Sequence, residues 1–206
     1  MTKNIDDICS AVKKIAWGFL LILLDFNVMT VNVLPDWIGY IMIVSSLGAV
    51  IADEDALRKL RPVGIILVVW NIIEWVAGIF GVGTYLSFVA VIPIVLNIYY
   101  IWHLFGNLAD IADKFACPQS GKILGWRVAY IILTVISSVI SYVSLLMNGG
   151  EIAYIGGLIL LVPGLILVIF IMSVLFSFSR TLKEKSELPM YQTMYKNPED
   201  NADINS

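Results

Sequence analysis

The stretch IAYIGGLILLVPGLILVIFIMSVLFSF occupies residues 152–178 and contains no charged side chain. A helix rises about 1.5 Å per residue and the hydrocarbon core of a bilayer is about 30 Å thick, so this stretch is long enough to cross a membrane. Arg180, Lys183 and Lys185 follow it closely. Because lysine and arginine are retained in the cytoplasm during insertion, we predict a spanning helix that ends on the cytoplasmic side.

Further apolar stretches precede this one and complete a pattern of six predicted spans. With the last one included, their boundaries are about 15–34, 36–52, 62–80, 84–105, 126–147 and 152–178. All 13 Lys and Arg residues lie on one side of the resulting topology, and none lies in the connections of the other side. The positive-inside rule therefore predicts an all-α polytopic protein of the cell membrane, with six transmembrane helices in three hairpins and both termini in the cytoplasm.

The composition supports this class and excludes others. Hydrophobic residues make up 59% of the 206-residue chain and charged residues 14%, whereas charged residues are about a quarter of an ordinary soluble domain. We expect residues 1–185 to form one transmembrane domain and the polar residues 186–206 to form a disordered cytoplasmic tail. The formal net charge of -3 argues against a nucleic-acid partner, because the basic residues are explained by membrane orientation.

The longest predicted cytoplasmic connection covers residues 107–122. Leu108, Ile111 and Phe115 recur there at helical spacing, which predicts a short helix lying on the inner membrane surface. Cys117 lies in the same connection and Cys9 near the N-terminus. Both would face a reducing compartment, so we expect two free thiols.

Two acidic residues fall inside predicted spans. By the helical rise, Asp25 lies about 16 Å and Glu74 about 20 Å beyond the basic residues that precede their spans. Both would lie in the outer half of the bilayer, in the same zone as Asn27 and Asn71. A charged side chain at that depth costs roughly 3 kcal/mol, so it normally faces protein or water. The four residues form our candidate intramembrane polar site; the alternative is that Asp25, protonated, only joins helices by hydrogen bonding.

Other polar features of the spans admit two interpretations each. Asn71 and Glu74 share a helix face that Trp70 and Trp75 flank, which fits a binding cavity or a packed interface. Small hydroxyls line one face of the fifth span, where close helix packing is the simplest explanation. They are Thr134, Ser137, Ser141 and Ser144. A polar pathway would require this stripe to face Asp25 and Glu74.

Two prolines and one histidine complete the candidates within the spans. Pro93 in the fourth span and Pro163 in the sixth predict helix kinks or unwound points, because proline removes a backbone hydrogen bond. His103 is the single histidine and has no ligand partners at metal-binding spacing, so no metal site is expected. It is a candidate proton relay, since histidine titrates near neutral pH.

No motif for nucleotide binding, zinc hydrolysis or a serine nucleophile occurs in the sequence. We therefore expect neither a catalytic residue nor a cofactor, and we do not expect an enzyme. A lipid-modifying activity would need a cluster of acids or histidines that the chain lacks.

The segment LDF at residues 24–26, followed by LPDWIGY at residues 34–40, resembles the start of small, uncharacterised multi-pass membrane proteins of Gram-positive bacteria. The resemblance covers the first two predicted spans. It draws attention to Pro35, Asp36, Gly39 and Tyr40 as a possible outer-face motif, in addition to Asp25. Pro35 and Asp36 also suit a helix start, where proline is tolerated and an acidic side chain favours the helix dipole.

Two functional hypotheses follow. The first is a small proton- or cation-coupled transporter-like protein in which Asp25 and Glu74 carry charge and Asn27 and Asn71 support a polar site for a small solute or ion. The second is a non-catalytic membrane partner or regulatory protein of a larger complex, with a protein partner at the cytoplasmic face. The lipid bilayer is the partner common to both.

Overall fold

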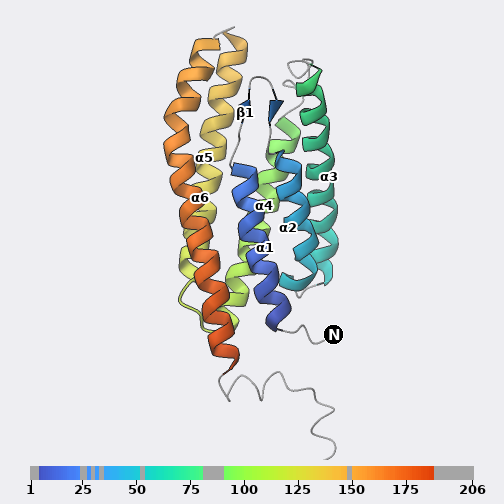
Figure 1. Cartoon of the computed structure of the whole chain (residues 1–206), viewed down its shortest axis with the longest axis vertical. Coiled ribbons are helices and arrows are strands. Elements are labelled where there is room, and N and C mark those ends of the chain that lie inside the picture. Colours follow the sequence, from blue (N-terminus) through green and yellow to red (C-terminus); the bar gives the residue numbers. More distant parts are fainter. Residues whose placement is uncertain are drawn as a thin grey trace, which may run out of the picture.

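Figure 1 shows a computed structural model of the chain, in which long helices run side by side. The structure describes residues 5–23, 27–28, 31–32, 35–51, 54–80, 91–147 and 150–187. The helices in this part of the chain are α1 (Ile5–Leu23), α2 (Asp36–Val50), α3 (Glu54–Ile79), α4 (Val91–Lys114), α5 (Ser120–Leu146) and α6 (Gly150–Ser186). A short antiparallel strand pair, β1 (Asn27–Val28) and β2 (Val31–Asn32), lies between α1 and α2 in the sequence.

Four of the described helices, α3, α4, α5 and α6, are long and apolar enough to cross a membrane. The described part of the chain is thus mainly helical, as expected, and four of its helices have the length and composition of membrane spans. Helix α2 is apolar but has 15 residues, or about 22 Å at the helical rise, which is less than the hydrocarbon thickness of about 30 Å. Helix α1 carries Asp6, Asp7, Lys13 and Lys14 along its first half, so only its second half is uniformly apolar.

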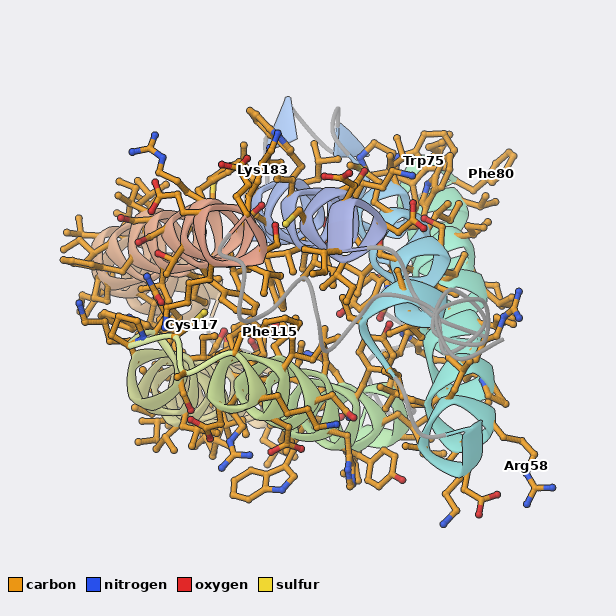
Figure 2. All side chains as sticks on the ribbon, turned by 90° about the horizontal axis from the view of Figure 1, so that it is seen from below. Arg58, Trp75, Phe80, Phe115, Cys117 and Lys183 are labelled. Carbon is orange, nitrogen blue, oxygen red and sulfur yellow. The ribbon has the colours of Figure 1, made fainter. Side chains whose placement is uncertain are left out.

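The helices form a ring in sequence order. Each helix packs against the helix before it and the helix after it in the sequence, and α6 closes the ring by packing against α1. Figure 2 shows this arrangement from below, along the helices. Sequence neighbours become spatial neighbours because the helices alternate in direction (Figure 1).

This alternation gathers the described basic residues at one end of the bundle, which we call the basic end. They lie in the first half of α1, at the starts of α3 and α5, and at the ends of α4 and α6 (Figures 1 and 2). They are Lys13, Lys14, Arg58, Lys59, Arg61, Lys114, Lys122, Arg127, Arg180, Lys183 and Lys185. The charge separation read from the sequence is therefore also a separation in space.

The buried core is concentrated in the half of the bundle near the basic end. Phe19, Tyr100, Phe105 and Phe178 are among its largest fully buried side chains. The Phe19 ring meets the Phe105 ring edge-on at a centroid distance of 5.2 Å. In the opposite half, many apolar side chains of α3, α5 and α6 remain exposed, as expected for surfaces that contact lipid.

Polar contacts fasten the connection between α4 and α5 to α6. The Gln119 amide nitrogen donates to Ser177 Oγ at 3.1 Å and to Thr181 Oγ1 at 2.9 Å, and Lys185 Nζ donates to the Phe115 carbonyl at 3.0 Å. In Figure 2, Phe115 and Cys117 lie between the ribbons of α4 and α6. Cys9 and Cys117 are both free and buried, which confirms the prediction of free thiols, and burial raises the pKa of the Cys117 thiol.

The predicted first span, residues 15–34, is wrong at residues 27–28 and 31–32, which form strands rather than helix. Helix α1 ends at Leu23, and β1 pairs with β2 with Asn27 opposite Asn32 and Val28 opposite Val31. The segment NVMTVNV at residues 27–33 consists mostly of β-branched residues and asparagine. Such residues are weak helix formers because they lose side-chain freedom in a helix or compete for its backbone hydrogen bonds. The stretch is apolar enough to suggest a span, but its composition favours extended structure.

The predicted surface helix within residues 107–122 is also wrong. Helix α4 continues without interruption to Lys114, and Leu108, Ile111 and Phe115 are buried in the common core. The same core contains Ile8 and Val12 of α1 and Leu182 of α6. Apolar residues at helical spacing indicate a buried face, but they do not distinguish burial in protein from burial in lipid.

Two other boundaries differ from the prediction. Helix α3 begins at Glu54 and passes through Pro62 rather than starting there, because residues 54–61, EDALRKLR, are mostly strong helix formers. Helix α6 is continuous through Pro163, so an unwound point is not seen. Between the predicted spans, the connection at residues 81–83 and the first two residues of the connection at 148–151 lie outside the described residues, as does the tail beyond residue 187.

The contact between α1 and α2 depends on two glycines. A Cβ atom on Gly39 would lie 2.5 Å from the Gly18 carbonyl oxygen and 2.7 Å from Ile22 Cγ1. Small residues at such crossings let two helix backbones approach closely. We expect Gly39→Ala to destabilise the protein by about 1–3 kcal/mol, as overpacking does. A lower midpoint of thermal unfolding in detergent would show this.

Gly48 supplies the matched control in the same helix. A Cβ atom there meets nothing within 4 Å, so Gly48→Ala should be neutral or stabilising by up to about 1 kcal/mol through helix propensity. Equal unfolding midpoints for the two variants would contradict the close crossing of α1 and α2.

Candidate functional site

A cavity of about 470 Å³ lies between α2, α3, α4 and α5. It is lined mainly by the second half of α3, the first two turns of α4 and the second half of α5. The cavity therefore lies in the half of the bundle away from the basic end (Figure 1). The lining residues are Tyr40, Leu67, Trp70, Asn71, Glu74, Pro93, Ile94, Asn97, Ser137, Ser138, Ser141, Tyr142 and Ser144. Most of them carry hydroxyl, amide, carboxylate or aromatic groups.

The helical period explains how two stripes of polar residues meet at this cavity. On α3, Leu67, Trp70, Asn71 and Glu74 follow one another at spacings of three, one and three, so they share one face. On α5, Ser137, Ser141 and Ser144 share a face in the same way. The structure turns these faces toward a common space. The serines of this stripe therefore line the same space as Glu74, which is one half of the condition for a polar pathway; the other half concerns Asp25, which lies outside the described residues.

Glu74 is the single carboxylate among the lining residues, and none of them is basic. Its side chain is exposed, whereas Asn71 is half-buried and donates from Nδ2 to the Leu67 carbonyl at 2.7 Å. The Trp70 indole nitrogen lies near the Glu74 carboxylate but makes no hydrogen bond of normal geometry. The carboxylate is thus bordered by an aromatic ring and an amide on its own helix and faces hydroxyls across the cavity.

A chain of hydrogen bonds crosses the bundle on the side of the cavity nearer the basic end. The Tyr40 hydroxyl donates to Asn97 Oδ1 at 3.1 Å, and Asn97 Nδ2 donates to the Tyr130 hydroxyl at 3.3 Å. The chain joins α2, α4 and α5, and both tyrosines are buried. Beyond it, Tyr100 and Phe105 are fully buried. The cavity is therefore separated from the basic end by a polar layer followed by a packed apolar layer.

The structure brings together part of the predicted polar site. Asn71 and Glu74 both line the cavity. Asp25 lies outside the described residues, and Asn27 is described only as part of β1. Whether Asp25 and Glu74 face a common space thus stays a prediction.

The possible outer-face motif divides between two roles. Pro35 caps the start of α2, and Asp36 lies in its first turn, as the sequence suggested. Gly39 faces α1, whereas Tyr40 lines the cavity. Adjacent positions of the motif therefore serve helix packing and the cavity.

The remaining candidates lie in different surroundings. His103 is exposed and its ring lies 4.4 Å from the Tyr99 ring, away from the residues that line the cavity; its role as a proton relay stays a prediction. Pro93 lines the cavity in the first turn of the described α4, where proline is tolerated. Trp70 lines the cavity, whereas Trp75 packs edge-on against Trp37 at 6.3 Å.

Sequence reasoning missed Asn97, Tyr130, Ser138 and Tyr142. Asn97 gave a usable signal, because it is an amide in an otherwise apolar stretch of the fourth span. Tyr130 and Tyr142 gave none, since tyrosine is equally common at membrane interfaces. Their contribution depends on which face of α5 turns inward.

Comparison with known proteins finds no matching family model, no similar curated protein and no similar solved structure. Among the described residues, no group of three or more His, Cys, Asp or Glu side chains is placed to hold a metal ion. The polar cavity is therefore the feature of the described structure that bears most directly on function.

The hydrogen-bond chain predicts coupled effects of substitution. Tyr40→Phe should lower the free energy of unfolding by about 0.5–1.5 kcal/mol, the usual net value of one hydrogen bond, and Asn97→Ala by about 1–3 kcal/mol, because it removes two. Because both remove the Tyr40 to Asn97 bond, the double variant should lose less than the sum of the two. Denaturant titration in detergent would measure the loss of unfolding free energy in each single variant and in the double variant.

The matched control is Tyr99→Phe, because Tyr99 is exposed on α4 and lies outside the cavity. This variant should keep the stability of the parent protein. Strict additivity of Tyr40→Phe and Asn97→Ala would show that the two side chains are not coupled.

Proposed function

We propose that the chain is an integral protein of the cell membrane with six spans in three hairpins and both termini in the cytoplasm. Three observations support this topology: four apolar helices of spanning length, the alternating direction of the helices, and the gathering of the described basic residues at one end. In this proposal α1 and α2 form the first hairpin, with the strand pair of β1 and β2 at its outer end.

Cysteine labelling tests the topology in a background that carries Cys9→Ala and Cys117→Ala. Met147 is exposed near the end of α5, and Asp55 is exposed at the basic end. A membrane-impermeant maleimide should label Met147→Cys and Asn32→Cys in intact cells, and Asp55→Cys only in inverted vesicles. Labelling of Asp55→Cys in intact cells would show that the basic end faces outward and would contradict the proposed orientation. Labelling of Asn32→Cys only in inverted vesicles would contradict the six-span topology.

We infer that the protein acts as a small proton- or cation-coupled transporter. The observation that carries this proposal is the cavity in the outer half of the bundle, where Glu74 is the one carboxylate and no side chain is basic among the described lining residues. A lone carboxylate in low-dielectric surroundings attracts a proton or a cation strongly, because few other charges or water molecules compete. The hydroxyl and amide groups of α3, α4 and α5 supply neutral oxygens around the same space.

The closed side of the cavity also supports transport. Coupled movement requires a binding site that is open to one side of the membrane while a barrier separates it from the other side. The chain of Tyr40, Asn97 and Tyr130 and the apolar layer beyond it form such a barrier toward the basic end. In our proposal Asp25 is a second charge carrier of the pathway, apart from the described lining of the cavity, which holds Glu74.

Reconstitution into liposomes tests the transport proposal. With a potassium gradient setting the membrane potential, the purified protein should carry a proton or cation flux that a pH-sensitive or cation-sensitive dye reports. Glu74→Gln and Asp25→Asn should each reduce the flux at least ten-fold, because each removes a charge carrier while nearly preserving side-chain shape. Expression and the elution volume of the variants should be unchanged.

Asp110→Asn is the control, since Asp110 is an exposed acid on α4 at the basic end. It should retain the full flux. Parent-like flux in both Glu74→Gln and Asp25→Asn would contradict the proposal. If the purified protein carried no flux and another protein consistently copurified with it, the alternative of a membrane partner or regulatory protein would take its place.

A further inference from the structure

We propose that the cavity binds a monovalent organic ammonium ion, with its charged nitrogen at Glu74 and its apolar part against Trp70 and the neighbouring apolar side chains. This inference deepens the proposed function and rests on it, because it names the class of cation that the same cavity takes. Three properties of the cavity carry it: its size, its net charge and the chemical character of its wall.

The size of the cavity fits a small molecule better than a bare ion. Its volume of about 470 Å³ lies within the range of about 300–1,000 Å³ that is typical of small-molecule sites. A divalent metal ion such as Ca²⁺ needs several oxygens that converge on it closely, commonly with carboxylates among them. The described part of the chain places no cluster of three acidic, histidine or cysteine side chains together.

The charge of the wall selects a single positive charge. Among the lining residues that the structure describes, Glu74 contributes one negative charge and no lysine, arginine or histidine neutralises it. A dication would leave one charge uncompensated in low-dielectric surroundings, and an anion would be repelled. A neutral solute would leave the carboxylate without a partner, so a monovalent cation is the charge that this site balances.

The aromatic and apolar groups of the wall select an organic cation. Trp70 lies one helical turn before Glu74 on the same face of α3, and its indole ring lies near the carboxylate. An ammonium group over an indole face gains a cation–π attraction that a strongly hydrated metal ion realises less readily. Leu67, Pro93 and Ile94 offer apolar contacts for the rest of the ligand.

The facing helix supplies hydrogen-bond acceptors for an ammonium that retains N–H groups. Ser137, Ser141 and Ser144 of α5 line the cavity opposite Glu74. Serine oxygens accept hydrogen bonds as readily as they donate them. A primary ammonium ion can thus donate to the Glu74 carboxylate and to a hydroxyl while its substituent lies against Trp70.

Calorimetric titration of the purified full-length protein in detergent tests this inference. Benzylammonium chloride is the probe, because it combines a primary ammonium group with an aromatic ring. Benzyl alcohol is its neutral analogue and sodium benzoate its anionic one. We expect benzylammonium to bind at least ten-fold more tightly than either analogue. Equal affinity of the alcohol and the ammonium ion would overturn the inference.

Substitutions then locate the site. Glu74→Gln should weaken benzylammonium binding at least ten-fold, whereas Glu74→Asp, which keeps the charge, should retain binding within a few-fold of the parent. Trp70→Leu should weaken binding several-fold and Asp110→Asn should leave it unchanged. If Glu74→Gln fails to fold, the affinities of Glu74→Asp and Trp70→Leu for benzylammonium still test the site. Unchanged binding in Glu74→Gln, or equal loss in Glu74→Gln and Asp110→Asn, would overturn the inference.

The failure of this inference and the failure of the transport proposal give different results. Flux of protons or potassium that depends on Glu74, without any binding of benzylammonium, would overturn the ammonium site and leave transport standing. Binding of benzylammonium that depends on Glu74, without any flux in liposomes, would support the ammonium site and overturn transport.

Discussion

A hydrocarbon environment offers no hydrogen-bond partner to a backbone amide or to a polar side chain, and this constraint determines most of the structure. Backbone groups must be paired within the chain, which favours long helices such as α3, α5 and α6. Polar side chains within those helices must pair with one another or line a space that admits water or solute. Asn97, which accepts from Tyr40 and donates to Tyr130, satisfies the first requirement. Glu74, exposed in the cavity, satisfies the second.

The constraint is met differently in the two halves of the bundle. Near the basic end, Phe19, Phe105 and Phe178 fill the interior, and Gln119 and Lys185 fasten the connection between α4 and α5 to α6. In the opposite half the ring of helices contains a cavity with serine, asparagine and carboxylate groups. A packed half can hold the helices in register while the other half leaves room for a ligand. The Tyr40 to Tyr130 chain marks the boundary between them.

The site was only partly visible in the sequence. Asn71 and Glu74 were recognisable because polar residues are costly and rare within apolar spans. The serine stripe of α5 was visible as a pattern, but close packing explained it equally well until the structure turned it toward Glu74. Tyr130 gave no signal, since a buried tyrosine and an interfacial tyrosine look the same in a sequence. Gly39 and Tyr40 lie side by side in the chain, yet one faces α1 and the other the cavity.

The sequence by itself determined that the chain is apolar and mainly helical, the approximate position of most of the described helices, and the end at which the described basic residues gather. Hydropathy and charge decide these features residue by residue, because transfer into lipid is nearly a local property of each stretch. Only the tertiary structure decided where α1 ends, that Leu108 and Ile111 are buried in protein rather than on a membrane surface, and which polar stripes share a cavity. These features depend on which helix faces meet, and such contacts join residues that are far apart in the chain.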